Sequence, residues 1–259
     1  VKKNETYIDG LLEGTQTEFF ENGDLSAKSF YRNGKFHGEQ ICYYENGQLY
    51  KKKNYINGLL DGEQLEFNSN GKISKKEFYT MNKPDGETVS YYDDNQLEEK
   101  IQYKNGLPEG KWLSYYWNKQ LKKSIQYKNG LPEGEWIYYY ANGQCKIKAF
   151  YKNGLLEGEQ LYYAENGDII QKEFYKGGLL DGNISFYDHK KKTFNTSIYK
   201  NGKLNGKAMV YLNGILVKEI FYKDGKFNGE YKIYYNDSKL YKKRNYENGI
   251  AKGNFITYF

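Results

Sequence analysis

Apolar and aromatic residues recur along this chain with a period of about 24 residues, a fixed spacing that is typical of a repeat array. A tyrosine marks the period and is taken here as position 0 of each repeat; the interval from Tyr199 to Tyr222 alone is one residue shorter than the others. Position 12 is aromatic in every copy, and positions 10 and 18 are apolar in most copies. The anchor tyrosines are Tyr7, Tyr31, Tyr55, Tyr79, Tyr103, Tyr127, Tyr151, Tyr175, Tyr199, Tyr222 and Tyr246.

The spacing within each repeat predicts a β-hairpin. Positions 10 and 12 have a strand period, because side chains two residues apart lie on the same face of a sheet. An Asn-Gly pair at positions 15 and 16, as in Asn166-Gly167, favours a tight turn because both residues tolerate positive φ. The returning strand then runs from position 17 to the next anchor tyrosine, and a longer Gly-rich loop such as Lys128–Gly134 leads into the next hairpin. In the shorter interval, the missing residue falls in the turn Leu212-Asn213-Gly214.

The register of these hairpins has two solutions. A two-residue turn would pair position 14 with position 17, whereas a three-residue loop with a glycine bulge would pair position 13 with position 17. The second solution places positions 10, 12 and 18 and the anchor tyrosine on one face of the sheet. We favour it because it gathers the most regular apolar positions together.

The repeats fill the whole chain, which predicts a single β-hairpin repeat array over residues 1–259. The expected fold class is all-β, an elongated array of about eleven antiparallel hairpins that forms a twisted, open, single-layer sheet. Long apolar runs that would predict a transmembrane helix are absent from the sequence. The chain begins at Val1 in the middle of a repeat, so we expect an upstream segment, and the compartment stays open between the cytoplasm and export.

The repeat unit Tyr-x-Asn-Gly-Leu-x-x-Gly, followed by Tyr-Tyr-x-Asn-Gly-x-Leu, resembles the bacterial MORN-repeat variant. A clear copy lies at residues 151–158 and 162–167. The resemblance covers essentially the whole chain and implies antiparallel hairpins that act as scaffolds, dimerisation modules, or protein- or membrane-contact surfaces. Bacterial members of this type are often labelled YwqK-family antitoxins. Two repeats depart from the pattern, at Asn82 in place of a glycine and at Asp188–Lys192 in place of the Asn-Gly turn, so we expect local twist or a bulge to change there.

The residues that carry chemistry give no sign of catalysis. His37 and His189 fall in loops and have no metal-ligand spacing with a cysteine or another histidine. Phosphate-loop, nucleophile-elbow and kinase motifs are absent, and the carboxylates follow the repeat instead of forming one acid–base pair. We therefore expect a protein that is not an enzyme and has no metal or cofactor. Cys42 and Cys145 lie too far apart in an extended array for a disulfide, and Cys145 is expected to be a small core hydrophobe.

Lysine recurs at position 21, and an acidic residue recurs at position 8. A ladder of lysines could bind the phosphates of a membrane surface, whereas the simpler interpretation is that lysines keep an exposed sheet soluble and discourage edge pairing. The net charge of +6 is mild, and the acidic residues argue against a specific nucleic-acid binder. Open edge strands would also allow an edge-to-edge homodimer.

Aromatic residues concentrate in repeats 5 to 7. Trp112 and Trp136 both occupy position 9, where most other repeats have Gln or Thr. Odd positions 11 and 13 should put further tyrosines on the same side, opposite the regular apolar face. These candidate partner-binding residues are Trp112, Trp136, Tyr116, Tyr138, Tyr140 and Tyr162. Trp and Tyr are enriched in interaction hot spots, although cross-strand aromatic ladders that stiffen the sheet are the alternative.

The expected function is a non-catalytic protein–protein interaction scaffold that presents an extended β surface, because a repeat array offers area instead of a deep pocket. A protein is therefore the expected partner. The alternatives are an antitoxin-like inhibitor of a partner toxin, and a secreted or surface adhesin of a bacterium that contacts host or envelope components.

Overall fold

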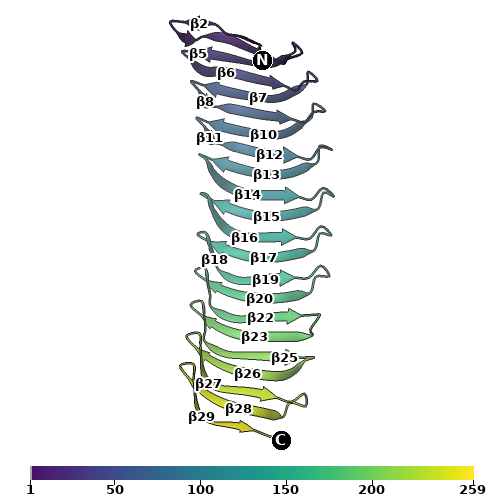
Figure 1. Ribbon diagram of the computed structural model, residues 1–259, viewed down its shortest axis with the longest axis vertical. Helices are drawn as coiled ribbons and strands as arrows, with labels where there is room; N and C mark the ends of the chain where they lie inside the picture. The colour runs from purple at the N-terminus through teal and green to yellow at the C-terminus, as the bar shows by residue number, and fades with distance from the viewer. Residues whose placement is uncertain (1) are drawn as a thin grey trace. The chain divides into compact units, whose positions relative to one another are not determined.

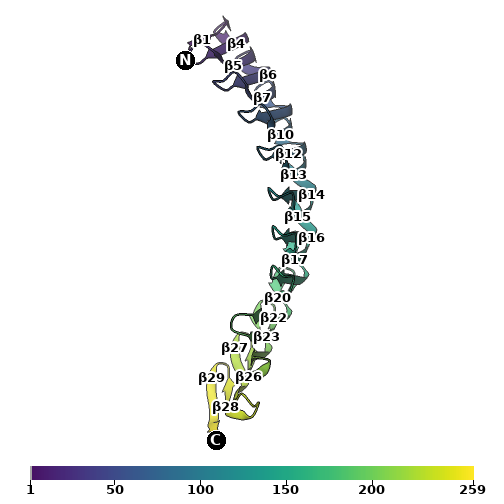
Figure 2. The ribbon, with the colours of Figure 1, turned by 90° about the vertical axis from the view of Figure 1, so that its right-hand side faces the viewer.

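The computed structural model describes residues 2–259, which form strands and turns and contain no helix. They divide into two compact units, unit 1 (Val1–Leu131) and unit 2 (Pro132–Phe259). Within each unit, antiparallel hairpins follow one another in chain order (Figure 1), and the strands lie in a single layer (Figure 2). The expected fold class of antiparallel hairpins in open single-layer sheets is confirmed. The assignment of residues 1–259 to one array stays a prediction.

The strands are short and evenly spaced. Those that begin in unit 1 before Leu131 are β1 (Lys2–Asn4), β2 (Tyr7–Ile8), β3 (Leu11–Leu12), β4 (Gly14–Phe19), β5 (Leu25–Arg32), β6 (Lys35–Tyr43), β7 (Leu49–Ile56), β8 (Leu59–Leu60), β9 (Gly62–Phe67), β10 (Ile73–Thr80), β11 (Lys83–Pro84), β12 (Gly86–Tyr91), β13 (Leu97–Lys104), β14 (Leu107–Tyr115) and β15 (Leu121–Lys128). Those that follow are β16 (Leu131–Tyr139), β17 (Cys145–Lys152), β18 (Leu155–Leu156), β19 (Gly158–Tyr163), β20 (Ile169–Lys176), β21 (Leu179–Leu180), β22 (Gly182–Asp188), β23 (Thr193–Lys200), β24 (Lys203–Leu204), β25 (Gly206–Leu212), β26 (Ile215–Lys223), β27 (Lys226–Tyr234), β28 (Leu240–Glu247) and β29 (Ile250–Thr257).

The hairpin turns have the register that the sequence favoured. In the first full hairpin, the backbone N–H of Phe20 at position 13 donates to the carbonyl of Asp24 at position 17 (2.8 Å), and Gly23 N–H donates to the Phe20 carbonyl (3.0 Å). Gly23 has φ +95°, as the glycine bulge of a three-residue loop requires. The repeat that is one residue shorter is closed instead by the two-residue turn Asn213-Gly214, so the missing residue does fall in the turn.

A second bulge overturns the predicted assignment of faces. Phe19 pairs with Leu25, but Glu18 pairs with Ala27, so Ser26 at position 19 has no partner opposite it. Within residues 2–259, the same shift occurs in every other hairpin whose turn follows position 12, except β22–β23. Because an extra residue reverses the alternation of side chains, positions 10, 12 and 18 share a face while the anchor tyrosine lies on the other. The prediction that all four share one face was wrong.

The two faces therefore carry different positions of the repeat. Cross-strand partners point to the same side of a sheet. The anchor tyrosines share one face with positions 5, 9, 11, 20 and 22, and we call it the tyrosine face. Positions 8, 10, 12, 18, 21 and 23 share the other, which we call the ion-pair face.

The segment expected to be a longer loop between hairpins is instead a second tight turn. Asn33 (φ +49°) and Gly34 (φ +73°) form a two-residue turn with both central residues in the left-handed region, and the flanking residues pair across it. In repeat 4, Asn82 takes the place of the glycine with φ +67°, and the pair that flanks the turn is kept. The expected change at Asn82 is therefore not seen, whereas the substituted turn of repeat 8 coincides with the loss of the bulge in β22–β23.

Successive tight turns are joined by hydrogen bonds that recur with the repeat. The N–H of Gly58 donates to the carbonyl of Phe36 in the preceding turn (2.7 Å), and equivalent bonds join most other turns. An acidic side chain at position 6 also accepts from the first N–H of the next turn, as Glu133 Oε2 does from Asn153 (2.6 Å). The acids that do so are Glu13, Asp61, Asp85, Glu109, Glu133, Glu157 and Asp181. Hydrogen bonds from Lys200 and from the Asn201 backbone lower the pKa of Asp181, which keeps this cap charged.

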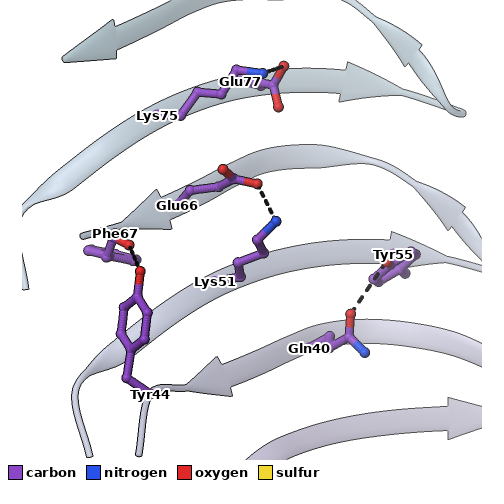
Figure 3. A network of polar contacts seen from close by, with 8 residues as sticks. All are labelled: Gln40, Tyr44, Lys51, Tyr55, Glu66, Phe67, Lys75 and Glu77. Carbon is purple, nitrogen blue, oxygen red and sulfur yellow. Dashed lines mark hydrogen bonds and ion pairs between the residues drawn. The ribbon is translucent and has the colours of Figure 1, made fainter. Parts of the chain in front are cut away.

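At the opposite edge of the sheet, a tyrosine at position 13 crosses to the next repeat. The Tyr44 hydroxyl donates to the carbonyl of Phe67 at 2.7 Å (Figure 3). Tyr92, Tyr140 and Tyr235 make the same bond in their own repeats. Each edge of the single layer is thus held by bonds between neighbouring hairpins.

The thin core lies mainly on the tyrosine face. Apolar side chains two residues before an anchor tyrosine, at position 22 of the full-length repeats, are among the few that are buried: Ile101, Ile125, Ala149 and Ile220. Gln64 at position 9 is also buried, and its amide group bonds with the N–H and carbonyl of Asn54 (3.1 and 3.2 Å). The glutamine at position 9 therefore bonds with the main chain of β7 at the point where the pairing of β7 passes from β9 (Lys52–Leu65) to β8 (Tyr55–Leu60).

The glycine at position 7 should tolerate substitution differently in different repeats. A Cβ at Gly182 (φ +139°) would lie 2.9 Å from Phe174 Cβ, whereas a Cβ at Gly158 (φ +75°) meets nothing within 4 Å. We expect Gly158→Ala to cost about 1 kcal/mol and Gly182→Ala about 3 kcal/mol of unfolding free energy, measured in urea. Equal costs would show that close packing at Gly182 is unimportant.

The acidic cap should matter more than the neighbouring exposed ion pair. Glu133→Ala removes the acceptor of Asn153 N–H, and we expect a loss of about 1 kcal/mol and faster hydrogen exchange at Asn153. Glu135→Ala, two residues away on the same strand, removes only the pair with Lys148 (3.0 Å) and should change stability by less than about 0.5 kcal/mol. Unchanged exchange at Asn153 in Glu133→Ala would contradict the capping role.

Candidate functional site

Trp112 and Tyr116 lie in unit 1, and the other four predicted aromatic residues lie in unit 2. Trp112 is half-buried on the tyrosine face, where it pairs across the strands with Ile125 and lies 5.9 Å from the ring of Tyr127. Lys123 Nζ sits 3.6 Å from the centre of the indole, a favourable cation–π distance. The indole Nε1 of Trp112 is buried and has no hydrogen-bond partner among the described residues. Tryptophan here thus loses the backbone bonds that glutamine makes at the same position.

In unit 2 the aromatic residues form a cluster on the tyrosine face. The ring of Trp136 lies 4.6 Å from that of the anchor Tyr151 and 6.2 Å from that of Tyr138. Ile147 pairs with Tyr138 on one side and with Tyr162 on the other, which brings Tyr162 into the same row. We call Trp136, Tyr138, Tyr151 and Tyr162 the aromatic cluster. All four are half-buried, and no second layer covers this face in the described part of unit 2.

The two tyrosines at position 13 stand apart from this cluster. The hydroxyl of Tyr140 donates to the carbonyl of Tyr163 (2.7 Å), so it belongs to the bonds that join neighbouring repeats at the turn edge. Lysine ammonium groups approach the rings of Tyr116 (5.7 Å from Lys122) and Tyr140 (5.4 Å from Lys146). The structure therefore gives Tyr140 a supporting role that its position in the sequence did not suggest.

Trp117 is an aromatic residue that sequence reasoning missed. It occupies position 14, in a hairpin turn, and its side chain is 75% exposed. Most other repeats have a small or acidic residue there, for example Glu45, Ser69 and Glu165. A large aromatic side chain at a turn position that is otherwise small or polar was the available signal.

The lysine ladder is compensated on its own face. Lysines at position 21 pair with glutamates at position 8 of the same hairpin. The pairs are Lys52–Glu39, Lys76–Glu63, Lys100–Glu87, Lys148–Glu135, Lys172–Glu159 and Lys243–Glu230. The hydrogen bond with Glu135 raises the pKa of Lys148, and those from Lys232 and Lys243 lower the pKa of Glu230. This pairing supports the interpretation that the lysines serve solubility, and binding of a membrane surface stays a prediction.

Burial raises the pKa of the anchor tyrosines. The affected residues are Tyr31, Tyr55, Tyr79, Tyr103, Tyr151, Tyr175 and Tyr222. On the ion-pair face, burial and a hydrogen bond to Glu219 (2.8 Å) raise the pKa of Tyr234 to about 12. Burial of Glu219 would raise its own pKa, but the hydrogen bonds from Lys207 and Tyr234 hold it below its usual value.

The remaining chemistry of the chain is sparse. Cys42 and Cys145 are free, half-buried thiols, and burial raises the pKa of both, which disfavours the reactive thiolate. No group of three or more metal-ligating side chains occurs within residues 2–259. The same residues include no helix that is long and apolar enough to cross a membrane.

Stability should fall in alkali because buried tyrosines resist ionisation. A tyrosine whose folded pKa exceeds its unfolded value of about 10 contributes stability that is complete below pH 10 and is lost as pH rises through the folded pKa. For Tyr234 the loss should fall between pH 10 and about 12. We expect Tyr234→Phe to lose less stability over this range than the wild type, as measured by urea unfolding at each pH. Parallel curves would contradict the assignment.

The family model described as the MORN repeat variant matches eight segments of the chain, residues 12–33, 36–57, 60–80, 84–105, 108–129, 132–153, 156–176 and 227–248. No curated protein matches the chain. Among solved structures, the chain is similar to part of a mutant Tc holotoxin pore of Photorhabdus luminescens, with 11% identity over 94% of this chain and 17% of that one and a TM-score of 0.20. It is also similar to part of the TcdB2-TccC3-Cdc42 structure, with 10% identity over 98% of this chain and 18% of that one and a TM-score of 0.16.

Structural similarity at these TM-scores is too low to support a conclusion about the fold or the function of the chain. The match to the family model is independent of these structural similarities, because the matched segments follow the same repeat as the strands and turns. The matched segments make up more than half of the sequence. The chain therefore belongs to the MORN repeat variant family, whose repeats generally build non-catalytic scaffolds.

Proposed function

We propose that this protein is a non-catalytic scaffold that binds another protein through its tyrosine face. The observation that carries the proposal is the aromatic cluster of unit 2, four half-buried rings on a sheet face that no second layer covers. Aromatic side chains bury 150–250 Å² each when a partner covers them, and they dominate the energetics of interfaces. A partner that covers this face would bury the parts of the four rings that the single-layer sheet leaves exposed.

The packing of the cluster also fits a rigid binding surface. Trp136 is fixed between Tyr138 and Tyr151, and its neighbour across the strands, Ala149, is buried. Rings held in place lose little conformational entropy when a partner binds. The cross-strand contacts between these rings also stabilise the sheet, so the same residues can serve both roles.

In unit 1, Trp112 supports the same proposal. Its buried Nε1 has no hydrogen-bond partner among the described residues, whereas the glutamine at the same position in other repeats bonds with the backbone. A buried polar group without a partner costs free energy, which the contacts with Tyr127 and Lys123 offset, and the indole also gives a partner a large aromatic surface. Tyr116, which lies in the same unit, is included in the proposal as a contact residue, as are Tyr138, Tyr140 and Tyr162 of unit 2.

The carboxylates have structural partners, which fits a protein without catalysis. Those at position 6 cap turns, and most of those at position 8 form ion pairs with lysines. Both arrangements repeat along the chain, unlike the unique pair of groups that acid–base catalysis needs.

The test uses replacements that the repeat itself contains. Gln occupies position 9 in several repeats, so Trp112→Gln and Trp136→Gln should remove an indole while the fold is kept. Wild type, each variant and the control Glu135→Gln on the ion-pair face would be used to capture proteins from lysate and envelope fractions of the source organism. We expect Trp136→Gln to weaken capture of a specific partner by about 2 kcal/mol, or roughly thirtyfold, while the variant stays folded at the temperature of the capture.

Capture that is equal in all variants, with the fold intact, would exclude the tyrosine face as the contact surface. The identity of a captured partner also decides between the alternatives. A small toxic protein would favour an antitoxin-like inhibitor, and a host or envelope component would favour an adhesin.

A further inference from the structure

The ion-pair face is interrupted at repeat 8. In this repeat, the glutamate of position 8 is replaced by Asn183 and the lysine of position 21 by Thr196. The hairpin β22–β23 that carries these residues is also the one without the bulge, and its strands pair regularly from Gly182–Tyr199 to Asp188–Thr193. It lies outside the segments that match the family model. Two short polar side chains thus stand where other hairpins have a long ion pair.

The charges on both sides of this hairpin are arranged symmetrically. On one side, Lys172 of β20 pairs with Glu159 of β19, which lies farther from β22. On the other side the usual polarity is reversed, because Lys207 occupies position 8 and pairs with Glu219 of β26 (2.5 Å). The order across the strands is therefore acid, lysine, the neutral hairpin, lysine, acid.

This order differs from the one in regular repeats of unit 2. There the lysine of one hairpin is followed by the glutamate of the next, as Lys148 of β17 is followed by Glu159 of β19. If β25 kept the usual polarity, a glutamate would stand in place of Lys207 and face β23. The reversal puts an ammonium group on each side of repeat 8 and leaves both carboxylates on the outer sides.

The interruption opens a hollow of about 500 Å³ between the two lysines. Its apolar lining includes Phe174, Ile198 and Met209, and Ile198 is 38% exposed. Lys172, Ser185, Thr196 and Met209 follow one another as direct cross-strand partners across it. The volume is within the range of small-ligand sites.

The polar groups at the hollow suit an acceptor. The Thr196 hydroxyl oxygen is buried and has no hydrogen-bond partner among residues 2–259. The two lysines hold their positions over aromatic rings, with Lys172 Nζ 5.1 Å from the Phe174 centroid and Lys207 Nζ 5.2 Å from the Phe221 centroid. Each ammonium group is bonded to the glutamate on its outer side, so a carboxylate in the hollow would compete with Glu159 and Glu219 for the two lysines and would find the Thr196 hydroxyl as a donor.

The backbone around the hollow is closely packed. A Cβ at Gly182 would lie 2.9 Å from Phe174 Cβ, and a Cβ at Gly206 would lie 3.0 Å from Ile198 Cβ. The two apolar walls are thus held directly against the main chain of the next strand. A site with fixed walls binds at a lower entropic cost than one that must be assembled.

We propose that this hollow is a binding site for a carboxylate attached to a compact apolar group, either a free acid or an acidic side chain next to an aromatic one in a protein. The lysine pair recognises the carboxylate, and Phe174, Ile198 and Met209 receive the apolar part. The proposal concerns the ion-pair face and does not rest on the protein-binding role of the tyrosine face.

The test is an NMR titration of the isotope-labelled full chain. The probes are phenylacetate, its neutral amide phenylacetamide, and a capped Glu-Phe dipeptide, each up to roughly 10 mM. We expect phenylacetate or the dipeptide to shift the resonances of Thr196, Ile198 and Met209 in a saturable way. The amide should bind roughly tenfold more weakly, because it lacks the charge that the two lysines attract. Tighter binding of the free acid or of the dipeptide identifies the source of the ligand.

The matched variant is Asn183→Glu with Thr196→Lys, which restores the ion pair of the other repeats and leaves the net charge unchanged. It should fold normally, since six hairpins already carry this pair, and it should lose at least tenfold in affinity because the hollow is filled. The control exchanges the charges of another hairpin in unit 2, Glu135→Lys with Lys148→Glu, and should bind like the wild type.

Three results would overturn the proposal: no saturable shift with either carboxylate probe, equal binding of the amide, or equal binding by the filled variant. The lysate capture that tests the tyrosine face is read out separately, so failure of one proposal leaves the other standing.

Discussion

Backbone hydrogen bonding between neighbouring strands is the interaction on which this structure depends. A single-layer sheet cannot bury much, and the few buried apolar side chains are thinly spread along it. Stability must therefore come from every N–H and carbonyl finding a partner in the next strand, which explains the recurring bonds at the two edges. There the acids at position 6 and the tyrosines at position 13 satisfy groups that the turns would otherwise leave unpaired.

The need to keep this ladder intact also explains the glutamine at position 9. Gln64 bonds with the main chain of Asn54 in β7, so a polar side chain is buried in a row where a larger protein would place an apolar one. Trp112 and Trp136 replace that amide with an indole and gain contacts with the anchor tyrosines Tyr127 and Tyr151. The two tryptophans thus exchange backbone bonds for aromatic packing on the same face.

Much of the fold could be predicted from the sequence, because period and turn chemistry are local. The spacing of the tyrosines and the glycine of the three-residue loop, such as Gly23, were enough for the hairpins and their register. The faces could not be predicted, because the unpaired residue at position 19, such as Ser26, has no special residue type that would reveal a bulge. The tight turn at Asn33-Gly34 was taken for a loop, although its Asn-Gly pair was the same signal that was read correctly in the hairpins.

The candidate site was less accessible to sequence reasoning. Parity along a strand did place Trp136 and Tyr138 together, but the hydroxyl bond of Tyr140 to the backbone of the next repeat depends on the sheet being formed. The reversed charges at Lys207 and Glu219 can be seen in the sequence as a break in the repeat pattern. That the reversal puts a lysine strand on each side of repeat 8 is seen only once the order of the strands is known.

The bonds between hairpins have a consequence for how such a chain can evolve. Each repeat offers to its successor the same acceptors that it uses from its predecessor, as Glu133 serves Asn153 and Glu157 serves Gly177. Duplication or deletion of one whole repeat unit therefore leaves no donor or acceptor unmatched. The near identity of residues 101–112 and 125–136 is what a recent duplication of this kind would leave behind. The number of repeats can thus change in single genetic steps. Substitutions within one repeat, such as those in repeat 8, can then add a binding site to that repeat alone.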